Sequence, residues 1–189
     1  TGMKSRQITV GDQAWTVRVD GPSSRHNVLL LPDADDPADV FDQVCARLHE
    51  SDLQTVVVES VAGLEPAGVH AILDALEMPY VNVAGRGAGA ALAWRVCAGR
   101  FGRFMSLVVA DHGHPAAPAA DGTVPDETCP PLELPVTMLV TKSLPRATAD
   151  ASGRFVYGEF RVVPLEVDNV ATEGAHELAT EIVLRTSLW

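Results

Sequence analysis

The chain has 189 residues, of which 47% are hydrophobic, so it is long enough for one well-cored domain and short for two. Its formal net charge of −11 argues against a nucleic-acid partner or an anionic membrane surface. No apolar run approaches the roughly 20 residues of a membrane-spanning helix, and the N-terminus lacks a signal-peptide layout. We expect a single domain over residues 3–189, with Thr1-Gly2 as a cloning remnant.

The three cysteines are widely spaced and odd in number, which is not typical of a disulfide framework or a zinc site. We therefore expect reduced thiols in a cytoplasmic protein. Cys97 falls on a predicted helix and is expected to be buried, whereas Cys129 falls in a Pro-rich stretch and is expected to be more exposed.

The first half of the chain alternates short apolar runs with amphipathic stretches. Nearly continuous apolar runs are typical of strands covered on both faces, and apolar residues at helical spacing are typical of packed helices. Asp36 is expected to cap the first helix, with Pro37 in its first turn. The expected strands are 7–10 and 14–19, which form a hairpin, then 28–31, 55–58 and 81–84, and the expected helices are 36–48, 66–76 and one that follows the strand at 81–84.

The second half continues this alternation around irregular segments. Pro164 interrupts the last strand and places it near a sheet edge, while residues 142–158 fit neither helix nor strand clearly. Leu178 and Ile182 are expected to face inward from the last helix. The expected elements are strands at 107–110, 136–140 and 160–167, a long loop at 115–131 and a helix at 172–188.

Strands that alternate with helices at this spacing predict an α/β fold with a mainly parallel sheet and helices on both faces. Ligands of such sheets bind beyond the carboxyl ends of the strands, so we expect any chemistry in the loops that follow the strands. These loops begin at Asp33, Glu59, Arg86, Asp111 and Asn169.

Residues 81–94, VNVAGRGAGAALAW, combine a strand, a turn of small residues and a helix start. This order is the layout of a nucleophile elbow, G-x-S-x-G, whose small residues let strand and helix approach while the middle residue carries the nucleophile. The five positions here run from Gly85 to Gly89. The nucleophile position holds Gly87, which has no side chain with which to attack.

With this motif, the chain resembles the α/β-hydrolase superfamily over nearly its whole length. Residues 76–111 are most similar to the elbow region of the carbon–carbon hydrolase, esterase and haloperoxidase-like branch. The resemblance implies an α/β-hydrolase-type sheet with an N-terminal hairpin. It also implies no cap domain, because the loop at 115–131 replaces the lid that such proteins commonly insert.

The same resemblance implies a degenerate catalytic triad. A catalytic histidine is expected after the last strand, where this chain has Asn169, and no carboxylate occurs at the usual acid position near Ser143. Asp111 suits an alternative acid position. The oxyanion loop corresponds to Asp33 and Ala34, and a carboxylate there would repel a developing oxyanion if its side chain turned inward.

Two hypotheses about function follow from these departures. Because nucleophile and base act as a unit, their joint loss predicts a non-catalytic protein that binds a small ligand or serves as a scaffold or regulator. Backbone amides at the helix start would then offer an anion cradle. The expected ligand pocket comprises Asp33, Ala34, Arg86, Gly87 and Ala88. Arg86 is expected to pair with Asp33 or Glu59, or to face solvent.

The alternative is an enzyme of non-standard mechanism, such as a hydrolase, lyase or cyclase, that uses Asp111 with His112 or His114 for acid–base steps. A His-x-His pair also suits a metal, but no further Cys or His is close in sequence, so we expect no metal and no cofactor. A solvated loop is the third interpretation of this segment. The expected partners are a small-molecule ligand and a homo- or hetero-oligomer, without nucleic acid or membrane.

Overall fold

The computed structural model describes residues 4–98 and 102–186. The predicted cloning remnant and the end of the predicted last helix lie outside these residues. None of the helices in the described part of the chain is long and apolar enough to cross a membrane.

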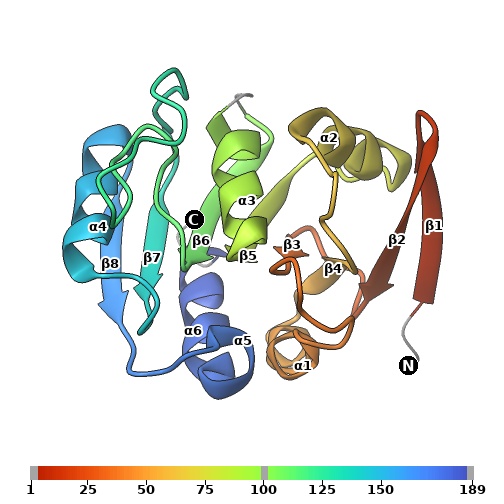
Figure 1. The fold of residues 1–189 in the computed structure, drawn as a ribbon. Coiled ribbons are helices and arrows are strands. Elements are labelled where there is room, and N and C mark those ends of the chain that lie inside the picture. Colours follow the sequence, from red (N-terminus) through yellow and green to blue (C-terminus); the bar gives the residue numbers. More distant parts are fainter. Residues whose placement is uncertain (1–3, 99–101, 187–189) are drawn as a thin grey trace.

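A single sheet runs through the molecule. Its strands are β1 (Lys4–Val10), β2 (Gln13–Asp20), β3 (Asn27–Leu31), β4 (Gln54–Val58), β5 (Val81–Arg86), β6 (Phe104–Ala110), β7 (Val136–Val140) and β8 (Phe160–Pro164). The strand order is β1-β2-β4-β3-β5-β6-β7-β8, with β8 at the edge that Pro164 predicts (Figure 1). β1 and β2 form the predicted hairpin, β2 is antiparallel to β4, and the remaining pairs are parallel, which confirms the mainly parallel sheet.

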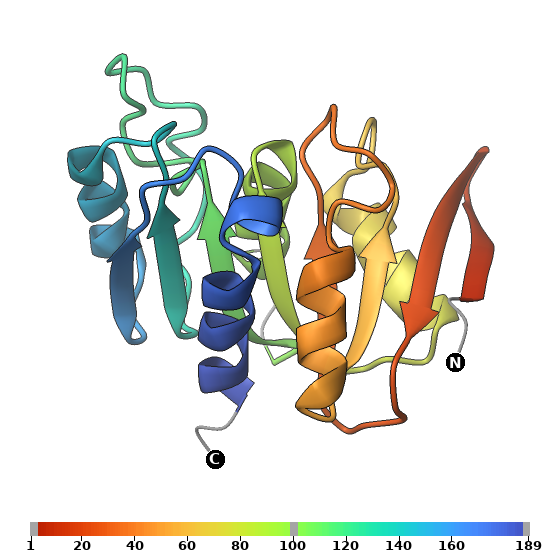
Figure 2. The ribbon, with the colours of Figure 1, turned by 90° about the horizontal axis from the view of Figure 1, so that it is seen from below.

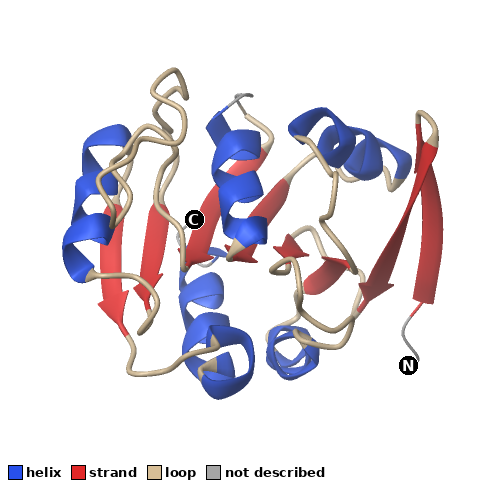
Figure 3. Ribbon diagram, in the orientation of Figure 1, coloured by secondary structure: helices blue, strands red, loops and turns tan. Residues whose placement is uncertain are grey.

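Helices cover both faces of this sheet, as the alternation of elements predicts (Figure 3). They are α1 (Asp42–Glu50), α2 (Pro66–Ala75), α3 (Ala88–Ala98), α4 (Arg146–Ala151), α5 (Val170–Glu173) and α6 (Ala175–Thr186), with a 3₁₀ helix, η1, at Ser152–Phe155. α2, α3 and α4 lie on one face, and α1, α5 and α6 on the other (Figures 1 and 2). Each face therefore has its own apolar core, one around Trp94 and one around Phe41.

Several boundaries differ from the sequence predictions. α1 begins at Asp42 rather than after Asp36, because the Asp36 carboxylate bonds to Arg86 and to the Asp33 amide instead of capping a helix. The predicted last helix is divided at Gly174 into α5 and α6. The ambiguous segment 142–158 contains α4 and η1.

The long loop between β6 and β7 folds back onto the protein. Its residues form no helix or strand apart from one isolated bridge, Leu132 to Val156, and no cap domain is inserted there. Cys97 is buried, as predicted. Cys129, which was expected to be more exposed, is buried as well, at 8% against 5% for Cys97. Burial raises the pKa of the Cys129 thiol, which keeps it protonated at neutral pH.

Candidate functional site

The turn between β5 and α3 has the steric requirements of an elbow. β5 ends at Arg86 and α3 begins at Ala88, which leaves Gly87 between them with a φ of +54°. A Cβ at Gly89 would lie 2.1 Å from the Leu31 carbonyl oxygen, and one at Gly85 would lie 2.7 Å from the Gly89 carbonyl oxygen. Only glycine lets strand and helix approach this closely, so the small residues of the motif are required by packing.

The carboxylate of Asp33 fills the space above Gly87. A Cβ added to Gly87 would lie 2.1 Å from Asp33 Cγ. Asp33 Oδ1 accepts hydrogen bonds from the backbone N–H groups of Ala88, at 2.9 Å, and Ala34, at 2.8 Å. One donor follows the nucleophile position and the other follows β3, which are the two places from which an oxyanion hole draws its donors. The side chain of Asp33 therefore turns inward and accepts both of these amides.

Asp33 is held in its ionised form. Its burial raises the pKa, but the amides of Ala88 and Ala34, with the nearby charges of Arg86 and His112, outweigh burial and leave the pKa below its ordinary value. A carboxylate that is already negative opposes the entry of a second anion. Of the amides at the start of α3 that were expected to bind an anion, that of Ala88 donates to Asp33 instead.

Arg86 joins the acidic groups around the elbow. Its Nη1 lies 2.5 Å from both carboxylate oxygens of Asp36, and its Nη2 lies 3.8 Å from Asp111 Oδ2. The side chain is buried, so these charges are largely removed from water. These partners differ from the expected ones, Asp33 or Glu59, and Glu59 lies near Arg18 instead. The expected alternative that Arg86 faces solvent is wrong as well, since its side chain is buried. Asp36 was not predicted as a site residue, because nothing in the sequence distinguishes it from the other acidic residues around it.

Asp111 sits in a strained and enclosed position after β6. Its φ is +66°, which is uncommon for a residue other than glycine, and its Oδ1 accepts a hydrogen bond from the Thr141 hydroxyl. Burial raises the pKa of Asp111, and the charges of Asp33 and Asp36 add to this effect, whereas Thr141 and Arg86 oppose it. Within the described residues, no group of three or more His, Cys, Asp or Glu side chains is arranged to hold a metal ion.

The two histidines that follow Asp111 have different environments. His114 is 1% exposed, with its Nε2 2.8 Å from the Pro130 carbonyl oxygen and its Nδ1 accepting the Ala116 amide at 3.0 Å. Its ring stacks on Phe155 at 4.7 Å. Burial lowers the pKa of His114, so the ring is neutral and both of its nitrogens are engaged. His112 is only partly buried, and its Nδ1 lies 3.0 Å from the Gly113 carbonyl oxygen.

Replacing His114 with alanine should lower the free energy of unfolding by about 2 kcal/mol, since the change removes a stacked ring and leaves two buried hydrogen-bond partners unmet. Urea unfolding followed by circular dichroism measures the loss. His112→Ala is the matched control and should cost less than about 1 kcal/mol, because that ring is partly exposed. Equal losses of unfolding free energy in the two variants would show that the buried contacts of His114 do not contribute to stability.

Asn169, which stands at the predicted histidine position, has a local structural role. Its Oδ1 accepts the Ala171 amide at 2.9 Å, and its own amide donates to Glu173 Oε1 at 3.0 Å. The side chain of Asn169 thus caps the start of α5. Asn169 thus satisfies a backbone N–H group at the helix start. Both of these hydrogen bonds are to residues of its own segment.

Asp111, His112 and His114 share a small cavity of about 100 Å³. Ala117, Leu144 and Thr148 complete much of its wall. Liquid water occupies about 30 Å³ per molecule, so the cavity holds only a few waters in its present form. The structure therefore brings the three residues together, but not around a space that fits a substrate of ordinary size.

Solved structures with a similar chain path include several enzymes. Epoxide hydrolase VrEH1 from Vigna radiata matches at 12% sequence identity and a TM-score of 0.77, covering 99% of this chain and 98% of that one. The thioesterase domain from the curacin biosynthetic pathway matches at 13% identity and 0.74, covering 97% and 100%. Est1E from Butyrivibrio proteoclasticus matches at 10% identity and 0.73, covering 97% and 99%.

No protein-family model matches this sequence, and no curated protein sequence matches it significantly. The likeness to solved structures extends over nearly the whole chain, although sequence identity is low. The similarity to these structures agrees with three features of the chain itself. These are the strand order, the antiparallel β2 and the elbow between β5 and α3. The protein therefore has the α/β-hydrolase fold.

Proposed function

We propose that the protein is a non-catalytic member of its fold class, which lacks the serine mechanism and serves as a ligand-binding, scaffolding or regulatory protein. The observation that supports this proposal most is the position of Asp33 Oδ1, which accepts the backbone amide of Ala88 at the elbow and that of Ala34 after β3. Covalent acyl transfer needs a nucleophile at Gly87 and a vacant pair of donors for the developing oxyanion. This chain offers a glycine at the first place and its own carboxylate at the second.

A direct test measures hydrolysis of p-nitrophenyl acetate by the purified protein. We expect no rate above that of buffer across a series of protein concentrations. A rate that scaled with protein concentration and persisted at constant specific activity through further purification would overturn the proposal.

Two engineered variants test whether Asp33 prevents catalysis at the elbow. Gly87→Ser with Asn169→His restores residues of the nucleophile and base types but retains the negative charge of Asp33 beside the elbow, even though the new Cβ displaces its carboxylate from the amides. We expect this variant to remain inactive. Adding Asp33→Ala removes this charge and leaves the two amides free, and we expect this triple variant to show slow labelling by a fluorophosphonate probe. If the double variant were labelled as fast as the triple variant, Asp33 would not be what blocks the site.

The second candidate is the enzyme of non-standard mechanism. It is supported by one observation, the burial of Asp111 beside His112 at the carboxyl edge of the sheet, with a raised pKa at the carboxyl group. For this candidate, His112→Ala should abolish a turnover without changing the melting temperature. The small volume of the shared cavity and the engaged nitrogens of His114 favour the non-catalytic proposal.

A further inference from the structure

A second cavity lies at the opposite edge of the sheet from the elbow. Its volume is about 760 Å³, and its lining residues come from the amino ends of β3, β5 and β6 and from the end of α6. They include Arg25, His26, Tyr80, Asn82, Met105 and Thr186. The volume lies in the range of roughly 300–1,000 Å³ that small-molecule sites occupy.

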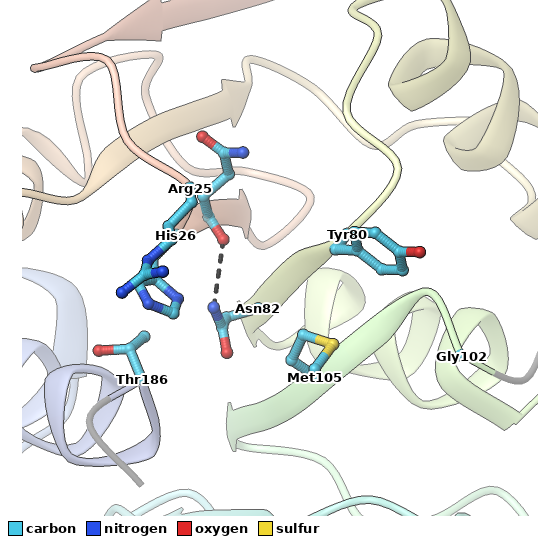
Figure 4. A pocket seen from close by; sticks show the side chains of 8 residues that line it. Arg25, His26, Tyr80, Asn82, Gly102, Met105 and Thr186 are labelled. Atoms are coloured by element: carbon cyan, nitrogen blue, oxygen red, sulfur yellow. Dashed lines mark hydrogen bonds between the residues drawn. The ribbon is translucent and has the colours of Figure 1, made fainter. Parts of the chain in front are cut away.

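The floor of this cavity is polar, and the side chain of Asn82 on it is hydrogen-bonded within the protein. Asn82 is 4% exposed, its Nδ2 donates to the Asn27 carbonyl oxygen at 3.4 Å, and its Oδ1 accepts the Ser106 hydroxyl at 2.7 Å (Figure 4). The Thr186 hydroxyl donates a hydrogen bond to the Val183 carbonyl oxygen. The lone pairs of the Thr186 hydroxyl oxygen can therefore accept hydrogen bonds from other donors. These bonds hold the floor in place without a ligand, as a preformed site requires.

One side of the cavity is basic. Arg25 and His26 lie together on that side (Figure 4). Arg25 is exposed, and none of the ion pairs found among the described residues involves it. In a chain with a net charge of −11, an unneutralised guanidinium at the mouth of a cavity marks a local site for a negative group.

The other side is apolar and aromatic. Tyr80 and Met105 lie across Asn82 from the two basic residues (Figure 4). Tyr80 is 58% exposed, one of the few large apolar side chains so open to solvent within the described chain. Its ring face and the Met105 thioether suit contact with a second aromatic ring.

We propose that this cavity binds a small aromatic carboxylate. The ring of the ligand would pack against Tyr80 and Met105, while its carboxylate accepts the paired N–H groups of Arg25. Charge alone would admit any anion, but the apolar wall opposite Arg25 selects one with a flat hydrophobic body. This site is independent of the proposed function, since it lies at the other edge of the sheet from Asp33 and Gly87.

The test titrates the full chain with 2-naphthoate and, as the neutral analogue, 2-naphthamide, by isothermal titration calorimetry. We expect saturable binding of 2-naphthoate with a stoichiometry of one, and binding of the amide at least tenfold weaker. Arg25→Gln should weaken binding of the acid by tenfold or more, and Tyr80→Ala by several-fold. Both side chains are exposed, so their replacement should leave the urea unfolding curve unchanged.

Arg146→Gln is the matched control, because it removes an exposed arginine of the same charge from another surface. It should leave the affinity for 2-naphthoate unchanged. The proposal is overturned if the wild-type protein shows no saturable binding up to the solubility limit, or if Arg25→Gln and Arg146→Gln bind the acid equally well. Retention of binding in Arg25→Gln together with tighter binding in Asp33→Ala, which frees the amides of Ala34 and Ala88, would place the anion at the elbow and would also overturn it.

Discussion

Gly87→Ser should lower the free energy of unfolding by about 2–4 kcal/mol, which is a large effect for the addition of one small side chain. Two costs combine. A side chain at a φ of +54° is strained by about 1 kcal/mol. The new Cβ would also lie 2.1 Å from Asp33 Cγ, so the carboxylate must leave the amides of Ala34 and Ala88. Urea unfolding of both proteins at neutral pH measures the difference.

Gly11→Ser separates these two costs. Gly11 has a φ of +61° and no atom within 4 Å of its added Cβ, so this variant carries the backbone strain without the collision. It should lose only about 1 kcal/mol. Adding Asp33→Ala to Gly87→Ser should recover part of the loss, and the double-mutant cycle should show coupling of about 1–3 kcal/mol. Independent effects of the two substitutions would contradict the position of Asp33 above Gly87.

The strands were predictable because each is specified by its own residues. A parallel strand covered on both faces must be apolar along its length, and the predicted run at 136–140 coincides with β7. The elbow was predictable for a similar reason, since close packing of β5, α3 and β3 admits only glycine at Gly85 and Gly89. Local chemistry is enough to predict such elements.

Pairings between distant residues were not predictable to the same degree. Asp36 has the sequence context of a helix cap, yet its carboxylate contacts Arg86, fifty residues further along the chain. Thr141 reaches Asp111 only because β6 and β7 are neighbours in the sheet. The sequence predicts that an inward-facing Asp33 would repel an oxyanion. It does not predict that the side chain faces inward, because that orientation depends on two amides from different segments. Tertiary contacts of this kind decide whether a predicted site is open.

Arg86→Met should be the most destabilising of the substitutions considered, with a loss of about 3–5 kcal/mol at neutral pH. Methionine preserves much of the length and apolar volume of the arginine stem but removes the charge. The buried carboxylates of Asp36 and Asp111 would then face each other, with Asp33 nearby, and no cation between them. Chemical unfolding at neutral pH measures the loss. Arg146→Met is the matched control, because its exposed pair with Asp150 should contribute less than about 0.5 kcal/mol.

The pH dependence of this loss tests its electrostatic origin. Burial raises the pKa of Asp111 above 3.8 in the folded protein, and the charge of Arg86 limits that rise. Without Arg86 the folded-state pKa rises further, so the native state of the variant binds a proton that the unfolded chain has released. Stability from this proton is fully present below 3.8 and is lost as the pH rises through the folded-state pKa. The deficit of Arg86→Met relative to wild type should therefore shrink as the pH falls toward 3.8. A deficit independent of pH would mean that lost packing, rather than uncompensated charge, destabilises the variant.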